Sequence, residues 1–97
     1  MVRLKRTPIT DRGLAYLAKV PTIRRLYLEE TAVTDRGLKQ VARLPQLEYL
    51  NLYGTRVTDD GLKRLKKSTA LRQLFVGKTQ VTDAGIAGLK ASVPELR

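Results

Sequence analysis

The chain of 97 residues contains no cysteine and no histidine. The absence of cysteine excludes disulfides, thiolate metal sites and a cysteine nucleophile, and the absence of histidine removes the commonest general base and metal ligand. No run of about 18 apolar residues is present, so we expect no segment that spans a membrane. Enzymes can function without both residues, but these absences count against one, and we predict no metal site and no cofactor.

The beginning of the chain, MVRLKRTPIT, lacks the apolar centre of a secretory signal, so we expect a soluble, cytoplasmic protein. The length suits one domain with one core. Nineteen basic residues against nine acidic ones give a formal net charge of +10. This excess favours anionic partners, such as nucleic acid or an acidic protein surface, without choosing between them.

The most informative feature of the sequence is an internal repeat with a period of 24 residues. Its most regular positions are the aspartates Asp11, Asp35, Asp59 and Asp83 and the glycines Gly13, Gly37, Gly61 and Gly85. Apolar residues recur in register, for example at positions 2, 26, 50 and 74 and at positions 4, 28, 52 and 76, and threonines recur at 7, 31, 55 and 79. A sequence with such a repeat is expected to stack copies of one supersecondary unit.

Each copy predicts one strand and one helix. The alternation over Leu47–Leu52 predicts a short strand, and the spacing of Leu62 and Leu65 predicts an amphipathic helix from Thr58 to about Lys67. One such unit cannot bury its apolar face alone, so neighbouring strands should form a parallel sheet with right-handed crossovers. Because helices are wider than the spacing between strands, the stack should curve with the sheet on its concave side.

The pattern L-x-x-L-x-L-x-x-T-x-V-T-D-x-G-L resembles the leucine-rich repeat family over nearly the whole chain. It is similar to the threonine variant that is abundant in bacterial proteins and akin to the cysteine-containing repeats of ubiquitin-ligase adaptors. The resemblance implies an α/β, right-handed solenoid of about four strand-helix repeats, which binds other macromolecules, usually proteins, through its concave sheet. It predicts a single domain over residues 1–97, with repeats starting near 1, 23, 47 and 71 and no separate capping module. Uncovered ends leave end-to-end self-association open.

The polar corner between each strand and its helix has a structural interpretation. Side-chain oxygens at a helix start accept hydrogen bonds from unpaired backbone N–H groups, and a carboxylate there interacts favourably with the positive end of the helix dipole. The predicted structural caps are Thr34, Asp35, Thr58, Asp59, Thr82 and Asp83. The repeated glycines should allow close packing against the next coil. Because these residues recur in all copies, we interpret them as stacking residues and predict no catalytic residue.

Function is expected at exposed positions that differ between copies. On the outer side of the strands, four of the five aromatic residues surround Asn51. Aromatic residues near asparagine and arginine are typical of interface centres, although they also pack well across strands. The predicted partner-binding residues on the concave face are Arg25, Tyr27, Tyr49, Asn51, Tyr53, Gln73 and Phe75.

A second group of residues is basic and falls on the outer faces of the middle helices. These residues are Lys39, Arg43, Lys63, Arg64, Lys66 and Lys67. They form either an anion-binding surface or an ordinary solvated helix face. The leading hypothesis is a non-enzymatic scaffold or adaptor that binds a protein. The alternatives are a nucleic-acid-associated factor, and a recognition fragment of a larger enzyme or of a ubiquitin-ligase-like adaptor.

Overall fold

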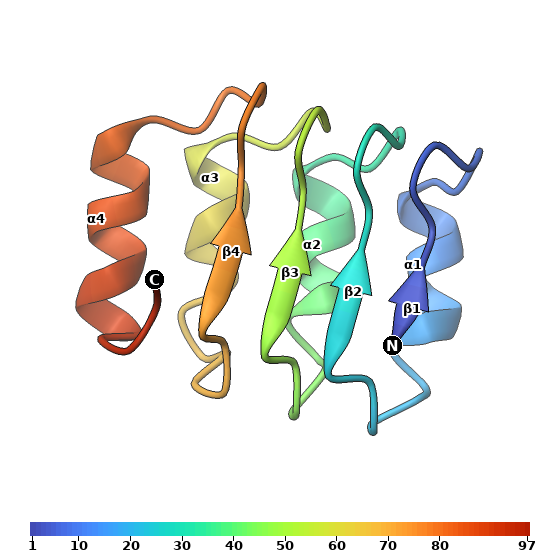
Figure 1. The fold of residues 1–97 in the computed structure, drawn as a ribbon, viewed down its shortest axis with the longest axis horizontal. Coiled ribbons are helices and arrows are strands. Elements are labelled where there is room, and N and C mark those ends of the chain that lie inside the picture. Colours follow the sequence, from blue (N-terminus) through green and yellow to red (C-terminus); the bar gives the residue numbers. More distant parts are fainter.

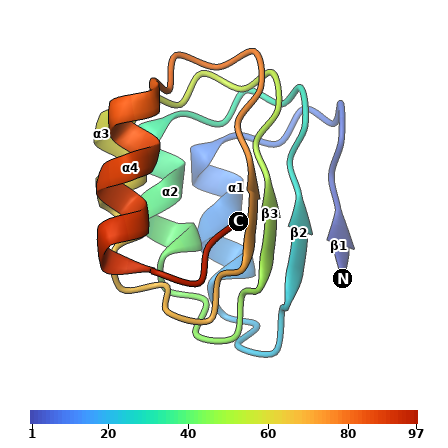
Figure 2. The same cartoon turned by 60° about the vertical axis from the view of Figure 1, so that its left-hand side comes forward.

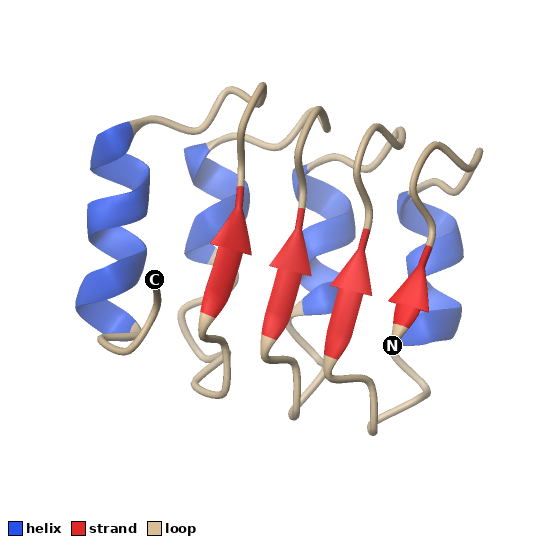
Figure 3. Cartoon of the chain, viewed as in Figure 1, coloured by secondary structure: helices blue, strands red, loops and turns tan.

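The computed structural model describes all residues from 1 to 97. Short strands and helices alternate along the chain: β1 (Val2–Arg3), α1 (Asp11–Leu17), β2 (Arg25–Tyr27), α2 (Asp35–Val41), β3 (Tyr49–Asn51), α3 (Asp59–Lys63), β4 (Gln73–Phe75) and α4 (Asp83–Ser92). The strands form one parallel sheet in the order β1-β2-β3-β4, and all the helices lie on one side of it (Figures 1 and 3). The predicted α/β repeat architecture is confirmed.

The strand register follows the sequence repeat. Tyr49 lies between Arg25 and Gln73, so each residue pairs with the residues 24 positions away. The chain rises along each strand and descends through the helix behind it, and each strand lies to the left of the one before, which makes the crossovers right-handed (Figure 1). The helices are spread more widely than the strands, so the sheet forms the inner side of the curve, as the two layers in Figure 2 also show.

The core lies between the sheet and the helices. Its centre is formed by the inward-facing leucines of the middle strands, of which Leu26, Leu28, Leu50 and Leu52 are 0% exposed. The equivalent positions in the outer copies are only partly buried, because each has a neighbour on one side alone. No helix has the length and apolar character needed to cross a membrane.

The helix of the third repeat, α3, is shorter than the sequence predicts. The helix expected to run from Thr58 to about Lys67 ends at Lys63. The N–H groups of Arg64 and Leu65 bond to carbonyls three residues earlier, at 3.0 Å each, so the chain tightens into turns there. This tightening places Leu65 in the core, where it is 0% exposed.

The threonines at the polar corners cap their helices as predicted. The hydroxyl of Thr34 accepts a bond from Arg36 N, that of Thr58 from Asp60 N, and that of Thr82 from Gly85 N, all at 3.3 Å. The hydroxyls of Thr31 and Thr55 donate to the carbonyls of Leu28 and Leu52, which directly follow β2 and β3, at 2.8 and 2.7 Å.

The prediction that the aspartates cap their own helices is wrong for Asp35 and Asp59, and Asp83 forms no side-chain hydrogen bond. Asp11, Asp35 and Asp59 each accept bonds from the threonine of the next repeat, through both its N–H and its hydroxyl. We call these contacts the Asp–Thr pairs, which join Asp11 to Thr34, Asp35 to Thr58 and Asp59 to Thr82. The aspartates stand in the first helical turn, where their charge suits the helix dipole, while their oxygens join neighbouring repeats.

One of the Asp–Thr pairs lowers the pKa of its aspartate. The hydroxyl of Thr82, followed by its backbone N–H, holds the pKa of the Asp59 carboxyl below its ordinary value. Lys63 acts in the same direction, and desolvation opposes it. The charged form of Asp59 is therefore the form that joins α3 to the start of α4.

The glycines of the first helical turn pack against the preceding coil, not the next one as predicted. A Cβ at Gly37 would overlap Asp11 Oδ1 and lie 2.8 Å from Leu14 Cδ1. A Cβ at Gly61 would overlap Asp35 Oδ1 in the same way. The glycine thus leaves space for the aspartate that reaches forward from the repeat before.

Candidate functional site

The sheet face turned away from the helices carries a stack of three aromatic rings. Tyr27 and Tyr49 have centroids 4.7 Å apart, and Tyr49 and Phe75 have centroids 5.5 Å apart. We call Tyr27, Tyr49 and Phe75 the aromatic row. Its members come from β2, β3 and β4, so the parallel register brings together residues that are far apart in the sequence.

Two arginines lie against this row. The guanidinium carbon of Arg3 is 4.9 Å from the Tyr27 centroid, and that of Arg25 is 5.1 Å from the Tyr49 centroid. Phe75, at the other end, is 46% exposed, and Gln73 lies opposite Tyr49 in the sheet. The row is thus an apolar strip with one guanidinium over the Tyr27 ring and one over the Tyr49 ring.

Asn51 lies between Tyr27 and Phe75 in the sheet, as predicted, but its amide bonds within the protein. Its Nδ2 donates to the Tyr49 hydroxyl at 3.2 Å, and its Oδ1 accepts from the Tyr53 N–H at 3.1 Å. The amide is therefore used inside the protein, where it orients Tyr49 and satisfies a backbone donor beyond the end of β3.

Tyr53, which the sequence places beside the other aromatics, does not stack on the row. A Cβ on Gly77 would lie 2.9 Å from Tyr53 Cδ2, so the ring covers this glycine. The Lys78 ammonium is 5.9 Å from the ring centroid. Tyr53 lies beyond the carboxyl end of β3 and belongs to a second feature, which the sequence pattern did not predict.

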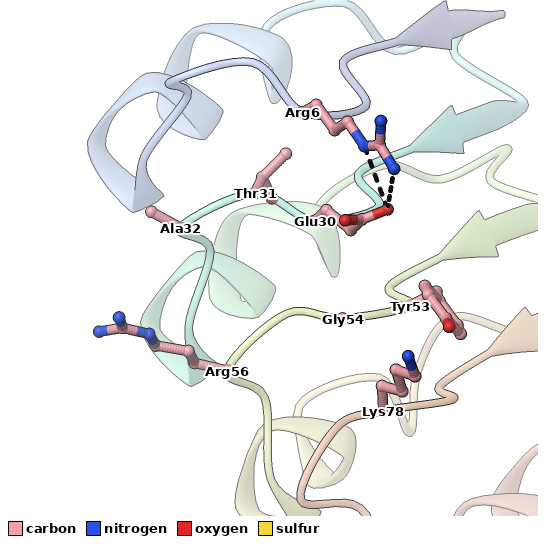
Figure 4. A pocket seen from close by; sticks show the side chains of 8 residues that line it. All are labelled: Arg6, Glu30, Thr31, Ala32, Tyr53, Gly54, Arg56 and Lys78. Carbon is pink, nitrogen blue, oxygen red and sulfur yellow. Dashed lines mark hydrogen bonds and ion pairs between the residues drawn. The ribbon is translucent and has the colours of Figure 1, made fainter.

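This second feature is a pocket of about 720 Å³, which we call the turn pocket. It is formed by the turns that follow the strands, and Figure 4 shows its lining. The turns carry Arg6, Glu30, Gly54 and Lys78, all with positive φ, at 56°, 55°, 71° and 51°. Only Gly54 has no side chain, which leaves a gap between Glu30 on one side and Lys78 on the other (Figure 4).

The charges in the turn pocket are unequally paired. Arg6 donates to Glu30 Oε1 through both Nε and Nη2, at 3.2 Å each. Lys78 and Arg56 form no ion pair, and Figure 4 shows Lys78 directed toward Tyr53. With three cations and one carboxylate, the lining carries a net charge of +2. The sequence signal that was missed is the series 6, 30, 54 and 78, in which one member is glycine.

The predicted basic residues of the helix face are all exposed on α2, α3 and the turns after them: Lys39, Arg43, Lys63, Arg64, Lys66 and Lys67. Of these, only Lys63 forms an ion pair, with Asp60 at 3.5 Å, and Arg43 donates a hydrogen bond to Gln40. The small pocket nearby, of about 120 Å³, lies between α3 and α4. The structure contains no group of three or more acidic residues placed to hold a metal ion. An anion-binding role for this face stays a prediction.

A curved stack of strand-helix units with an open sheet face is the architecture of a repeat scaffold. A family model described as "Leucine Rich repeat" matches residues 44–66, about one copy of the repeat. No curated protein matches the sequence. The repeat, the fold and this match together give the chain the architecture of a leucine-rich-repeat solenoid.

Solved structures with the same fold are distant in sequence. An internalin from Listeria monocytogenes has a TM-score of 0.61 and 17% identity, over 95% of this chain and 32% of that one. A leucine-rich-repeat protein from Leptospira interrogans has a TM-score of 0.57 and 13% identity, over 86% of this chain and 26% of that one. The chain therefore spans about a third or less of these larger proteins, and the likeness concerns the fold.

Proposed function

We propose that this protein is a non-enzymatic interaction module that binds a protein partner through the aromatic row. Leucine-rich-repeat folds generally mediate protein–protein interaction, which supports the class of function. The observation that carries the proposal is the stack of Tyr27, Tyr49 and Phe75 on the open face of the sheet. Tyrosine and arginine are the residues that contribute most at interface centres.

The row is already ordered before any partner binds. Tyr49 is held by Tyr27 on one side, Phe75 on the other and the Asn51 amide at its hydroxyl. Side chains that are fixed in advance lose little entropy on binding. A partner that places an apolar side chain on this strip would bury ring surface at a low ordering cost.

The repeated polar residues support a role outside catalysis. The Asp–Thr pairs use both carboxylate oxygens of three aspartates to join neighbouring repeats. The Asn51 amide on the sheet face bonds to its neighbours. These groups have structural partners, which accounts for their presence without a substrate.

The proposal is tested by affinity purification from the native extract, followed by binding measurements with the recovered partner. We expect the double variant Tyr27→Ala and Tyr49→Ala to weaken binding by about 30-fold or more, as loss of an interface centre does. The matched control is Tyr16→Ala, because Tyr16 is 72% exposed and lies on α1, away from the row. Equal affinity of the double variant and the wild type would rule out the aromatic row as the binding site.

Salt distinguishes this proposal from binding to a polyanion through the helix face. Binding that depends on phosphate contacts weakens steeply between about 50 and 200 mM salt. Binding through the aromatic row should change little over this range, because its main contribution is apolar. A steep loss for both the wild type and the Tyr27 and Tyr49 double variant would favour the basic helix face instead.

A further inference from the structure

The turn pocket differs from the rest of the turn row in a way that makes room for a ligand. The four turns share one left-handed backbone conformation, and three of them carry long charged side chains. At Gly54 a Cβ would lie 3.0 Å from Glu30 Cγ, so the gap there exists because this residue is glycine. Arg6, Glu30 and Lys78 adopt the same conformation, so the backbone does not require glycine at position 54. The consequence of glycine there is the space that its missing side chain leaves.

The free charge in the pocket is positive. Glu30 is already paired with Arg6, whose guanidinium donates two hydrogen bonds to one oxygen of the Glu30 carboxylate. Lys78, on the other wall of the gap, has no carboxylate partner and lies near the Tyr53 ring. A second carboxylate placed over Gly54 would meet the Lys78 ammonium on the side away from Glu30. The chemistry that fits this wall is therefore an anion of carboxylate size.

The pocket is connected to the aromatic row through side chains. Tyr49 bonds to Asn51, and Asn51 bonds to the backbone of Tyr53, which lines the pocket. Tyr49 and Tyr53 are four residues apart on an extended chain, which corresponds to about 13 Å. A partner segment that runs parallel to β3 would cover this distance with about four residues.

We propose that the turn pocket receives a carboxylate of the bound partner, about four residues after an apolar side chain that lies on the aromatic row. This inference rests on the proposed function, because it specifies which peptide the same sheet face selects. The carboxylate is either an acidic side chain or the carboxyl terminus of the partner. Lys78 holds it, and Gly54 leaves the space for it.

The test uses short peptides and the 15N-labelled protein, observed by NMR titration. The first probe is acetyl-Phe-Ser-Ser-Ser-Glu-amide, and its control has glutamine in place of glutamate. A third peptide, acetyl-Phe-Ser-Ser-Ser-Ala with a free carboxyl terminus, distinguishes the two sources of the carboxylate. We expect the glutamate peptide to shift the amide signals of Tyr53, Gly54 and Lys78, and to bind about threefold more tightly than the glutamine peptide, as one exposed ion pair allows.

Protein variants separate the carboxylate contact from the apolar one. Lys78→Gln should abolish the preference for glutamate over glutamine, whereas Lys66→Gln, which removes an exposed lysine on the helix side, should retain it. Gly54→Asn should have the same effect as Lys78→Gln, because asparagine tolerates the left-handed turn and fills the gap without changing charge. A circular dichroism spectrum like that of the wild type shows that each variant is folded.

The outcomes separate this inference from the proposed function. Equal binding of all the peptides, with shifts along Tyr27, Tyr49 and Phe75, would overturn the carboxylate site and leave the aromatic row in place. Shifts confined to the lysines of α2 and α3 would overturn it as well, since the acidic peptide would then bind the helix face. Tyr49→Ala should weaken every peptide equally, whatever the peptide's terminal group.

Discussion

The carboxylate of Asp35 binds both polar hydrogens of Thr58: Oδ1 accepts the backbone N–H at 2.7 Å and Oδ2 accepts the hydroxyl at 2.6 Å. The same hydroxyl accepts the N–H of Asp60 at the start of α3. One threonine thus caps its own helix and receives the aspartate of the previous one. Asp83 holds the equivalent position in α4 and forms no such bond.

We expect Asp35→Ala to lower the free energy of unfolding by about 1–3 kcal/mol, because it leaves two half-buried donors of Thr58 without their acceptor. Urea denaturation followed by circular dichroism measures the change. The control is Asp83→Ala, at the same position of the repeat but exposed, which should change stability by less than about 0.5 kcal/mol. If the two variants lost equal stability, helix dipole effects would explain the aspartates better than the Asp–Thr pairs.

The pair between Asp59 and Thr82 should make the free energy of unfolding depend on pH in acidic solution. The Thr82 bonds lower the pKa of Asp59 from its ordinary value of 3.8, so the ionised form is favoured by folding. This stabilisation is fully present above pH values near 3.8 and is lost as the pH falls through the lowered pKa of the folded state.

The measurement is the urea midpoint of the wild type and of Asp59→Asn between about pH 7 and pH 2. The difference should be constant down to about pH 5 and should shrink in more acidic solution. Asp60→Asn is the control, because this neighbouring side chain is paired only with Lys63 and joins no second repeat. A difference for Asp59→Asn that grew on acidification would contradict the sign of the linkage.

Two glycines within helices should respond in opposite ways to alanine. Gly61→Ala would place a Cβ against Asp35 Oδ1 and 2.9 Å from Leu38 Cδ1, so we expect a loss of about 1–3 kcal/mol from overpacking. Gly88 in α4 has no atom within 4 Å of a Cβ. Gly88→Ala should therefore stabilise the protein by about 0.5–1 kcal/mol through helix propensity. Thermal unfolding of both variants tests the pair, and a gain for Gly61→Ala would show that the coils can separate easily.

Removal of two buried hydroxyls, those of Ser68 and Thr55, should affect stability differently. Ser68 is 6% exposed, and its hydroxyl has no hydrogen-bond partner, although it lies in the position that Leu44 fills with an apolar side chain one repeat earlier. We expect Ser68→Ala to be neutral or to stabilise by up to about 1 kcal/mol. Thr55→Val removes a bond of 2.7 Å to Leu52 O and should cost about 1 kcal/mol. Calorimetry compares the two, and a clear loss for Ser68→Ala would indicate a bond to solvent at this site.

The repeat predicted much of what the structure contains. Because the side chains of a strand alternate and the copies are 24 residues long, the sequence placed Leu26 and Leu50 in the core and Tyr27 and Tyr49 on the open face. The threonine caps followed from local chemistry. The end of α3 was not predicted, because the turns after Lys63 depend on how Leu65 reaches the core.

The site was only partly accessible from the sequence. The stack of Tyr27, Tyr49 and Phe75 agrees with the predicted group of aromatics, whereas Asn51 proved to be an internal bonding partner. The turn pocket was missed because it is defined by a side chain that Gly54 lacks, and patterns of present side chains do not reveal such a space.

By itself, the sequence determined which residues are equivalent, because a constant repeat length forces a constant register on a parallel sheet. That register decided which side chains share a face and which fill the core. Only the tertiary structure decided the partner of each polar atom. Asp35 stands at the start of its own helix, but the Arg36 N–H there bonds to Thr34, and Asp35 instead bonds to Thr58 of the next repeat, where Gly61 leaves room for its carboxylate. The choice depends on distances of a few ångströms between coils, which spacing along the chain does not specify.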